Sequence, residues 1–218
     1  MRKCVKKFVA IVAESFPLRE PIYEFGSLQV PGQEGFADLR SIFPGQRYIG
    51  ADMRPGPGVD VILDLHRIAL PDGSAGTVLC LDTLEHVEYP HAALSEIHRI
   101  LAPSGIAVIS SVMDYPVHDY PLDYWRFTPM ALTSLLKPFS DSFVGFAGKE
   151  SFPDTVVGLG FKDGLPDITD FMKKYRQWQR AENRNPKRLL KLITPPLMQP
   201  LLPRLYAGLA GVKRLFRV

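Results

Sequence analysis

The chain has 218 residues, of which 46% are hydrophobic, and its formal net charge is +3 at pH 7. This composition is sufficient for one well-buried core with an appendage. No apolar run is long enough to span a membrane, and the apolar run 8–13 is too short for a signal peptide. The two cysteines, one of them in a predicted buried strand, argue against a disulfide framework. We therefore expect a cytoplasmic globular protein.

The first part of the chain begins with a basic segment and continues with short strands. Residues 1–18 predict an N-terminal basic helix. Three apolar segments that follow are interpreted as strands, and each ends in or near an acidic residue or a glycine. They are Tyr23-Glu24-Phe25-Gly26, Tyr48-Ile49-Gly50-Ala51-Asp52 and residues 59–65, the last followed by Leu70-Pro71-Asp72-Gly73.

Residues 77–111 predict a strand, a helix and a second strand. The runs 78–81 and 106–109 are apolar and too short for helices, which favours strands buried on both faces of a parallel sheet. Between them, apolar residues from Ala93 to Leu101 recur at helical spacing, and Pro103 and Gly105 end the helix. Residues 82–86 then lie past the carboxyl end of the first strand, where open α/β sheets bind ligands.

Residues 114–128 follow the second of these strands and are rich in aromatic and charged side chains. This composition is typical of a loop that covers a substrate site. Thr128 and Pro129 predict the N-cap and first residue of a helix over 130–136. The residues expected to bind substrate are Asp114, Tyr120, Tyr124, Trp125 and Arg126. An equally supported alternative is that Trp125 and Phe127 seal the sheet edge while Arg126 pairs with a carboxylate.

Together, these segments resemble a class I S-adenosylmethionine-dependent methyltransferase of the small-molecule type, over roughly residues 19–163. The resemblance implies an α/β fold in residues 19–163: a Rossmann-like, doubly wound, mostly parallel seven-stranded sheet with a terminal antiparallel hairpin. It also implies S-adenosylmethionine as the cofactor and a small or glycan-linked methyl acceptor. Residues 123–128 are similar to a segment of bacterial methyltransferases that are associated with glycan synthesis.

The same resemblance implies the cofactor-binding residues, which are Glu24, Gly26, Asp52, Met53, Asp64, Leu65 and Asp82. A carboxylate at Asp52 can accept hydrogen bonds from both ribose hydroxyls, and Asp64 matches the position that meets the adenine amine. Either carboxylate alone could be a solvated loop residue, but the two at successive strand ends favour a binding role.

The first loop departs from the pattern of the family. The family usually has further glycines two and four residues after the first, where this chain has Leu28 and Val30. Either Gly32 and Gly35 let the loop take a different path into a helix over 36–42, or the site has lost affinity. Because the later carboxylates are retained, we favour the different path.

Methyl transfer mainly requires alignment of the reacting atoms, but a hydroxyl acceptor also needs a base. His118 is the leading candidate because a histidine in the predicted substrate loop titrates near neutral pH, and His86 is the second candidate. No metal-ligand pattern stands out in the sequence, and Cys4 and Cys80 do not suggest a zinc site.

The charge of the chain is concentrated at its end. Residues 173–218 contain 12 Lys and Arg against one acidic residue, Glu182. We interpret residues 164–218 as a basic helical extension. It could bind an anionic membrane surface together with the N-terminal helix, which would place the protein peripherally at the inner membrane face. Alternatively, its apolar stripe packs on the domain or on a second subunit of an oligomer. Nucleic-acid binding is not expected.

Three function classes are consistent with these features. The first is a methyltransferase acting on a small or glycan-linked acceptor, at oxygen. The second is a catalytically silent cofactor-binding or scaffold protein with the same fold, which only the altered first loop supports. A nicotinamide-dependent dehydrogenase is a lesser alternative, because the first loop lacks the three glycines of that motif.

Overall fold

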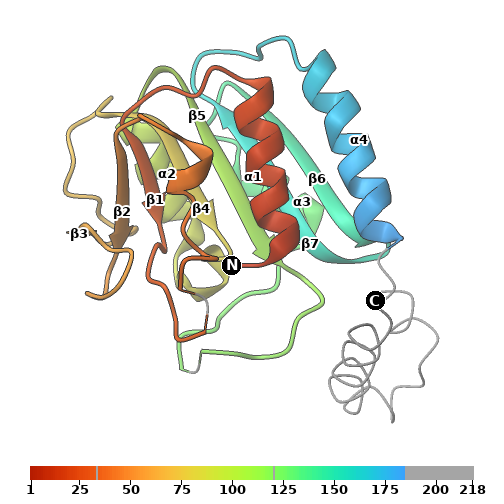
Figure 1. Ribbon diagram of the computed structural model, residues 1–218, viewed down its shortest axis with the longest axis horizontal. Coiled ribbons are helices and arrows are strands. Elements are labelled where there is room, and N and C mark those ends of the chain that lie inside the picture. The colour runs from red at the N-terminus through yellow and green to blue at the C-terminus, as the bar shows by residue number, and fades with distance from the viewer. Residues whose placement is uncertain (33, 120, 185–218) are drawn as a thin grey trace, which may run out of the picture.

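The computed structural model describes residues 1–184 except 33 and 120, and in this part the chain forms one seven-stranded sheet (Figure 1). The strand order is β3-β2-β1-β4-β5-β7-β6. The strands are β1 (Ile22–Phe25), β2 (Tyr48–Asp52), β3 (Val61–Ile62), β4 (Ala75–Leu81), β5 (Leu101–Val112), β6 (Asp141–Lys149) and β7 (Phe152–Phe161). The first five pair in parallel and the last two are antiparallel. The predicted mostly parallel sheet with a terminal antiparallel hairpin is confirmed.

The unit predicted over residues 77–111 forms with one difference: the helix ends at Ile100, and Pro103 and Gly105, predicted to form the turn after it, lie within β5, which begins directly at Leu101. All seven residues of β4 are buried, as is typical of a central parallel strand covered on both faces. The α-helix α2 (Pro90–Ile100) buries its apolar side, including Leu94 and Ile97, while Glu96 and Arg99 form an ion pair on its opposite side. A second helix, α3 (Pro129–Leu135), begins at the predicted cap, where the Thr128 hydroxyl accepts a hydrogen bond from the Ala131 N–H.

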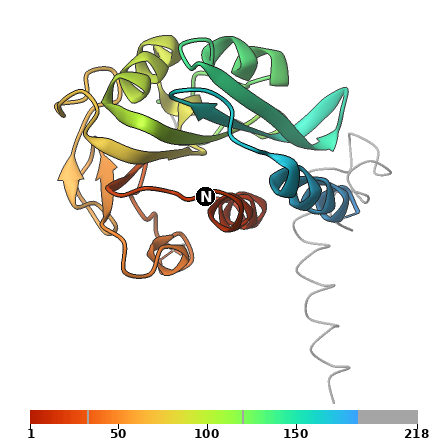
Figure 2. The same cartoon turned by 90° about the horizontal axis from the view of Figure 1, so that it is seen from above.

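Helices cover both faces of the sheet in three layers (Figure 2). Helices α2 and α3 pack on one face and share one apolar cluster with it. On the other face lie α1 (Lys3–Ser15) and α4 (Thr169–Asn183), which contact each other and contribute to a second cluster. The rings of Phe8 and Trp178 are in contact within this second cluster, tilted by 52° at a centroid distance of 5.4 Å. Both ends of the described chain therefore belong to the same packed structure as the sheet.

Two predicted elements are shorter than the sequence suggested. The helix predicted over 36–42 is wrong, because only a single 3-10 turn, Arg40–Ile42, forms there. The Asp38 carboxylate accepts a hydrogen bond from the Arg40 N–H and starts the turn, and Pro44 follows two residues after its end. The strand predicted over 59–65 is only the two residues of β3, because the Asp64 side chain accepts the His66 N–H and turns the chain.

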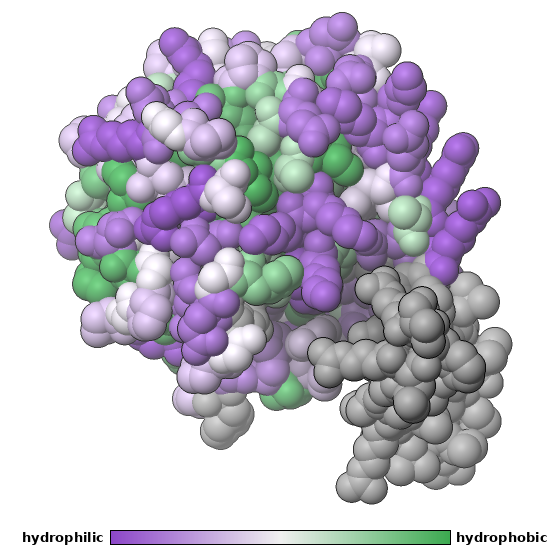
Figure 3. Space-filling view, in the orientation of Figure 1, coloured by the Kyte–Doolittle hydropathy of each residue, from purple (hydrophilic) through white to green (hydrophobic). Residues whose placement is uncertain are grey.

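The N-terminal helix does not offer an apolar surface to a membrane. Its apolar side, including Val5 and Val12, is fully buried against the sheet and α4. The face of the molecule that carries α1 and α4 is largely hydrophilic (Figure 3). No helix in residues 1–184 is long and apolar enough to cross a membrane. The predicted amphipathic helices of the basic extension fall mostly in 185–218, which lie outside the described residues.

Candidate active site

A cavity of about 420 Å³ opens at the carboxyl ends of the parallel strands. Residues just past β1, β2 and β4 and the end of β5 contribute to its walls. This is the position at which open α/β sheets bind ligands. Nine of the residues predicted from the sequence line the cavity: Glu24, Gly26, Asp52, Met53, Asp64, Leu65, Asp82, His86 and His118.

The first loop bends tightly into this cavity at Gly26. Its φ of +84° lies in the left-handed region, and a Cβ atom there would lie 2.0 Å from Oγ1 of Thr83. The Thr83 hydroxyl is itself held by the carbonyl of Leu81. The next residue, Ser27, is buried and lines the cavity, and its hydroxyl has no hydrogen-bond partner within the described residues. At this tight turn the first loop therefore presents the Ser27 hydroxyl, which is free to hydrogen-bond to a ligand in the cavity.

The two carboxylates at successive strand ends take up different environments. Asp52 ends β2 with a largely buried side chain that accepts a hydrogen bond from the backbone N–H of Arg54. Asp64 lies just after β3 and is more exposed. Its pKa is lowered by the hydrogen bond from the backbone N–H of His66, and the His66 ring also contacts it at 2.8 Å. Because both carboxylates line the cavity, both can accept hydrogen bonds from a ligand.

Glu24 is a buried carboxyl group within β1. It accepts a hydrogen bond from the Tyr48 hydroxyl on the neighbouring strand. Burial raises its pKa to about 7, although the hydrogen bond from Tyr48 acts in the opposite direction. Glu24 is therefore a cavity-lining carboxyl group with a raised pKa.

Arg2 and Asp82 form a salt bridge on one wall of the cavity. The guanidinium of Arg2 binds both carboxylate oxygens of Asp82, at 2.7 and 3.0 Å, and also donates to the Thr155 hydroxyl. Burial acts to raise the pKa of Asp82, but the charge of Arg2 holds it below its usual value. Because Ser110 also donates to this carboxylate, Asp82 has little free acceptor capacity, and its role as a cofactor ligand stays a prediction.

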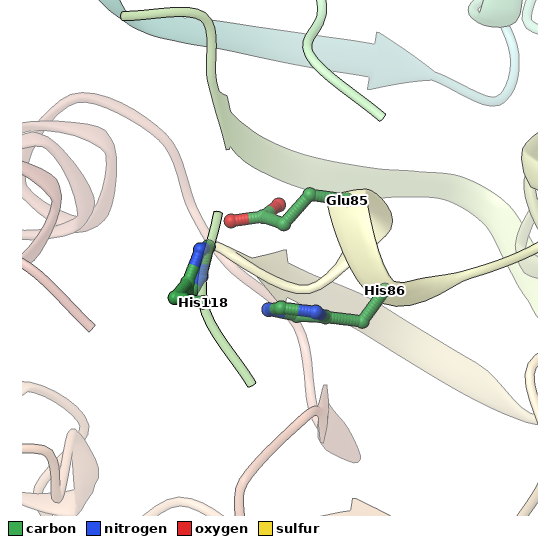
Figure 4. A group of neighbouring side chains, drawn as sticks. All are labelled: Glu85, His86 and His118. Atoms are coloured by element: carbon green, nitrogen blue, oxygen red, sulfur yellow. The ribbon is translucent and has the colours of Figure 1, made fainter. Parts of the chain in front are cut away.

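Glu85, His86 and His118 come together at the cavity (Figure 4). One potential ligand atom from each lies within 4.8 Å of the others, and the two imidazole rings are 4.7 Å apart between centroids. Glu85 and His86 belong to the 3-10 turn Leu84–His86, whereas His118 comes from the loop after β5. Burial and the charge of Asp82 raise the pKa of Glu85 to about 7.

The loop after β5 brings the predicted His118 to the cavity, but not the residues expected to bind substrate. Tyr115 and Leu122 line it, whereas Asp114, Tyr124, Trp125 and Arg126 do not, and Tyr120 lies outside the described residues. Arg126 instead makes a bidentate pair with Asp123, at 2.6 and 2.7 Å, which is the alternative considered from the sequence. The Trp125 indole donates to the carbonyl of Val87. A role in substrate binding stays a prediction for the five residues named from the sequence: Asp114, Tyr120, Tyr124, Trp125 and Arg126.

Three features of the site were not evident from the sequence. Arg2 reaches the cavity across 80 positions of sequence, so no local pattern could reveal its pairing with Asp82. Glu85 was expected at the ligand-binding rim, but its complete burial next to His118 depends on how the loop after β5 folds back. Asp123 was read only as part of a polar loop. A carboxylate three residues before an arginine was the one local signal for its pairing with Arg126.

Comparisons with known proteins agree with the fold. A family model described as a methyltransferase domain matches residues 45–109. No curated protein matches the chain. A solved structure of a possible histamine N-methyltransferase from Thermotoga maritima has a TM-score of 0.52 at 19% identity and covers 73% of this chain and 92% of its own.

Two other solved structures extend this likeness. A methyltransferase dependent on S-adenosylmethionine from Archaeoglobus fulgidus has a TM-score of 0.58 at 17% identity, covering 74% of this chain and 95% of that one. A complex of the Trm112 methyltransferase activator with a putative methyltransferase from Haloferax volcanii has a TM-score of 0.53 at 16% identity, with 76% and 91% covered. The chain therefore has the fold of these methyltransferases, and the comparisons support S-adenosylmethionine as its cofactor.

Proposed function

We propose that this protein transfers a methyl group from S-adenosylmethionine to an oxygen atom of a small or glycan-linked acceptor. The observation that carries the proposal is one cavity that joins two carboxylate-bearing strand ends to the Glu85, His86 and His118 cluster. The strand ends suit a nucleoside, and the cluster suits an acceptor that must lose a proton.

The residues of the cavity fit the proposed cofactor. Gly26 lets the first loop turn tightly at the cavity, because a Cβ atom there would collide with Thr83, and the unused hydroxyl of Ser27 follows it on the cavity wall. We expect Asp52 to accept hydrogen bonds from the ribose hydroxyls and Asp64 from the adenine amine, and the position of both carboxylates on the cavity wall supports this. When bound, the cofactor supplies an electrophilic methyl group on a sulfonium. The protein holds it in line with the acceptor and excludes water.

The acceptor is proposed to bind beside the histidine cluster. Transfer forms the new oxygen–methyl bond and breaks the sulfur–methyl bond, leaving S-adenosylhomocysteine, while the acceptor's hydroxyl proton passes to a base. Nδ1 of His118 faces the Asp123 carboxylate at 3.3 Å and the carbonyl of Pro116 at 3.2 Å. With a proton held on Nδ1, the Nε2 atom can accept the acceptor's proton, so His118 is the expected base and His86 the second candidate.

The proposal also includes the class of the acceptor and where the reaction takes place. A glycan-linked acceptor is favoured by the likeness of residues 123–128 to glycan-associated methyltransferases. A lipid-linked glycan would lie near a membrane surface, which the basic residues after 184 suit electrostatically. The proposal of methyl transfer is argued from residues 1–184 and does not depend on this membrane contact.

The proposal is tested by product formation. The purified protein is incubated with S-adenosylmethionine and a panel of hydroxylated acceptors, and S-adenosylhomocysteine and the methylated acceptor are both quantified. We expect stoichiometric formation of both products and a fall in turnover of about 100-fold or more in His118→Ala, with cofactor affinity nearly unchanged. Cofactor binding without turnover on any acceptor would instead favour the catalytically silent alternative.

A further inference from the structure

The cluster at the cavity contains a carboxylate and two imidazoles from two separate segments. The adjacent Glu85 and His86 lie on one short turn, and His118 approaches from the loop after β5. Figure 4 shows the Glu85 carboxylate and both rings around a common space. Three donors of this kind within 4.8 Å of one another are the protein part of many metal sites that retain an open position.

Both imidazoles are oriented by contacts to their Nδ1 atoms. Nδ1 of His86 lies 2.6 Å from the carbonyl oxygen of Leu122 and must donate its proton to it. Nδ1 of His118 faces the carbonyl of Pro116 and the carboxylate of Asp123, which the Arg126 guanidinium holds in place. The Nε2 atoms therefore carry the free lone pairs. Metal-binding histidines in proteins are oriented in this way by carbonyl and carboxylate partners.

The carboxylate of Glu85 has an acceptor atom that nothing within the described residues uses. One of its oxygens accepts a hydrogen bond from the Ser111 hydroxyl at 2.6 Å, but Oε1 has no hydrogen-bond partner. The residue is completely buried, and a buried polar atom without a partner destabilises a fold. A cation bound at the cluster would satisfy this oxygen.

We propose that Glu85, His86 and His118 bind a divalent transition-metal ion. Two imidazole donors favour an ion such as Zn²⁺ over Mg²⁺, which prefers oxygen ligands. Metal–ligand bonds of about 2.0–2.2 Å place neighbouring ligand atoms about 3–3.5 Å apart, so the cluster must contract by about 1 Å. His118 can make this movement because it lies on a loop and its side chain is partly exposed.

The open coordination positions of the ion face the cavity. They can be filled by water or by an oxygen atom of the acceptor, and a bound hydroxyl loses its proton more readily. This use of the ion rests on the proposed function. His118 is then a ligand, and the proton of the bound hydroxyl passes to solvent water instead of to Nε2 of His118. Binding of the ion does not rest on methyl transfer and is tested separately.

The test measures metal affinity on the full chain, freed of metal with a chelator that is then removed. Zn²⁺ is titrated by calorimetry, and Co²⁺ is used as a probe whose visible absorption reports nitrogen and oxygen ligation. We expect one ion per chain. In Glu85→Gln, His86→Ala and His118→Ala, affinity should fall by about 100-fold or more. His91→Ala, which changes an exposed histidine on α2, should bind as the wild type does.

The outcomes decide the proposal without any activity measurement. Absence of Zn²⁺ and Co²⁺ binding to the wild type overturns it, as does binding that persists unchanged in the three cluster variants. Equal affinity for Mg²⁺ and Zn²⁺ overturns the assignment to a transition metal. Circular dichroism identifies any variant that fails to fold. His118→Ala keeps the proposal falsifiable because its side chain lies on a partly exposed loop outside the helices and strands.

Discussion

Replacement of Gly26 by alanine perturbs the site at its tightest point. The added Cβ would lie 2.0 Å from Oγ1 of Thr83 and 2.9 Å from Cγ2, closer than non-bonded atoms can approach. Thr83 cannot move away freely because its hydroxyl donates to the carbonyl of Leu81 at 3.0 Å. The loop between β1 and the cavity would therefore have to shift.

The loss of free energy of unfolding expected in Gly26→Ala has two causes, backbone strain and overpacking. Gly32→Ala, which has only the first, separates them. A φ of +84° costs an alanine about 1–2 kcal/mol, and overpacking adds about 1–3 kcal/mol. Gly32 has nearly the same φ, +83°, but a Cβ there meets nothing within 4 Å. Gly32→Ala should therefore lower the free energy of unfolding by about 1–2 kcal/mol, and Gly26→Ala by about 2–5 kcal/mol.

Urea unfolding gives both free energies, and calorimetry gives the affinity for S-adenosylmethionine. We expect Gly26→Ala to weaken cofactor binding at least tenfold and Gly32→Ala to leave it nearly unchanged. In a Thr83→Ala background the two closest atoms are gone but the Cβ atom at 3.0 Å remains, so the overpacking part of the cost of Gly26→Ala should become smaller. Equal effects of the two glycine replacements on stability and affinity would refute the reasoning.

Three other predictions follow from the same geometry. Asp52→Ala should weaken S-adenosylmethionine binding by about 2–4 kcal/mol in calorimetry without loss of the fold, and unchanged affinity would remove Asp52 from the site. Burial raises the pKa of Glu24 to about 7 from an ordinary 4.5, so the free energy of unfolding of the ligand-free protein should fall as pH rises between these values. Glu24→Gln should remove the part of that fall that comes from Glu24, up to about 3 kcal/mol in urea unfolding, while the part from Glu85 stays, and an identical pH dependence would contradict the role of Glu24. Arg2→Met should cost about 2–4 kcal/mol because it leaves the Asp82 carboxylate buried without its partner, and Asp82→Asn should recover part of that loss; a fully stable Arg2→Met would argue against the pair.

Local patterns in the sequence were enough to predict the central elements. The strand over 77–81 and the helix after it are specified by their own apolar spacing, and Thr128 and Pro129 specify the start of α3. These features depend on residues within a few positions of one another. The helix expected over 36–42 failed because a seven-residue segment next to Pro44 is too short for its own spacing to decide its structure.

The arrangement of the site depended on contacts between distant residues. Asp52 and Asp64 were predicted as cofactor ligands from the family resemblance and from their positions at successive strand ends, which parallel strands bring to one edge of the sheet. The approach of His118 to Glu85, and of Arg2 to Asp82, is set by the path of the loop after β5 and of the N-terminal segment. Neither path has a periodic signal in the sequence.

The central claim is that the cavity at the strand ends is an S-adenosylmethionine site, and equilibrium binding tests it most directly. Calorimetric titrations of the full chain are performed with S-adenosylmethionine and, separately, with NAD⁺. We expect saturable binding of one S-adenosylmethionine per chain and no binding of NAD⁺. Binding of NAD⁺ alone, or of neither ligand, would contradict it.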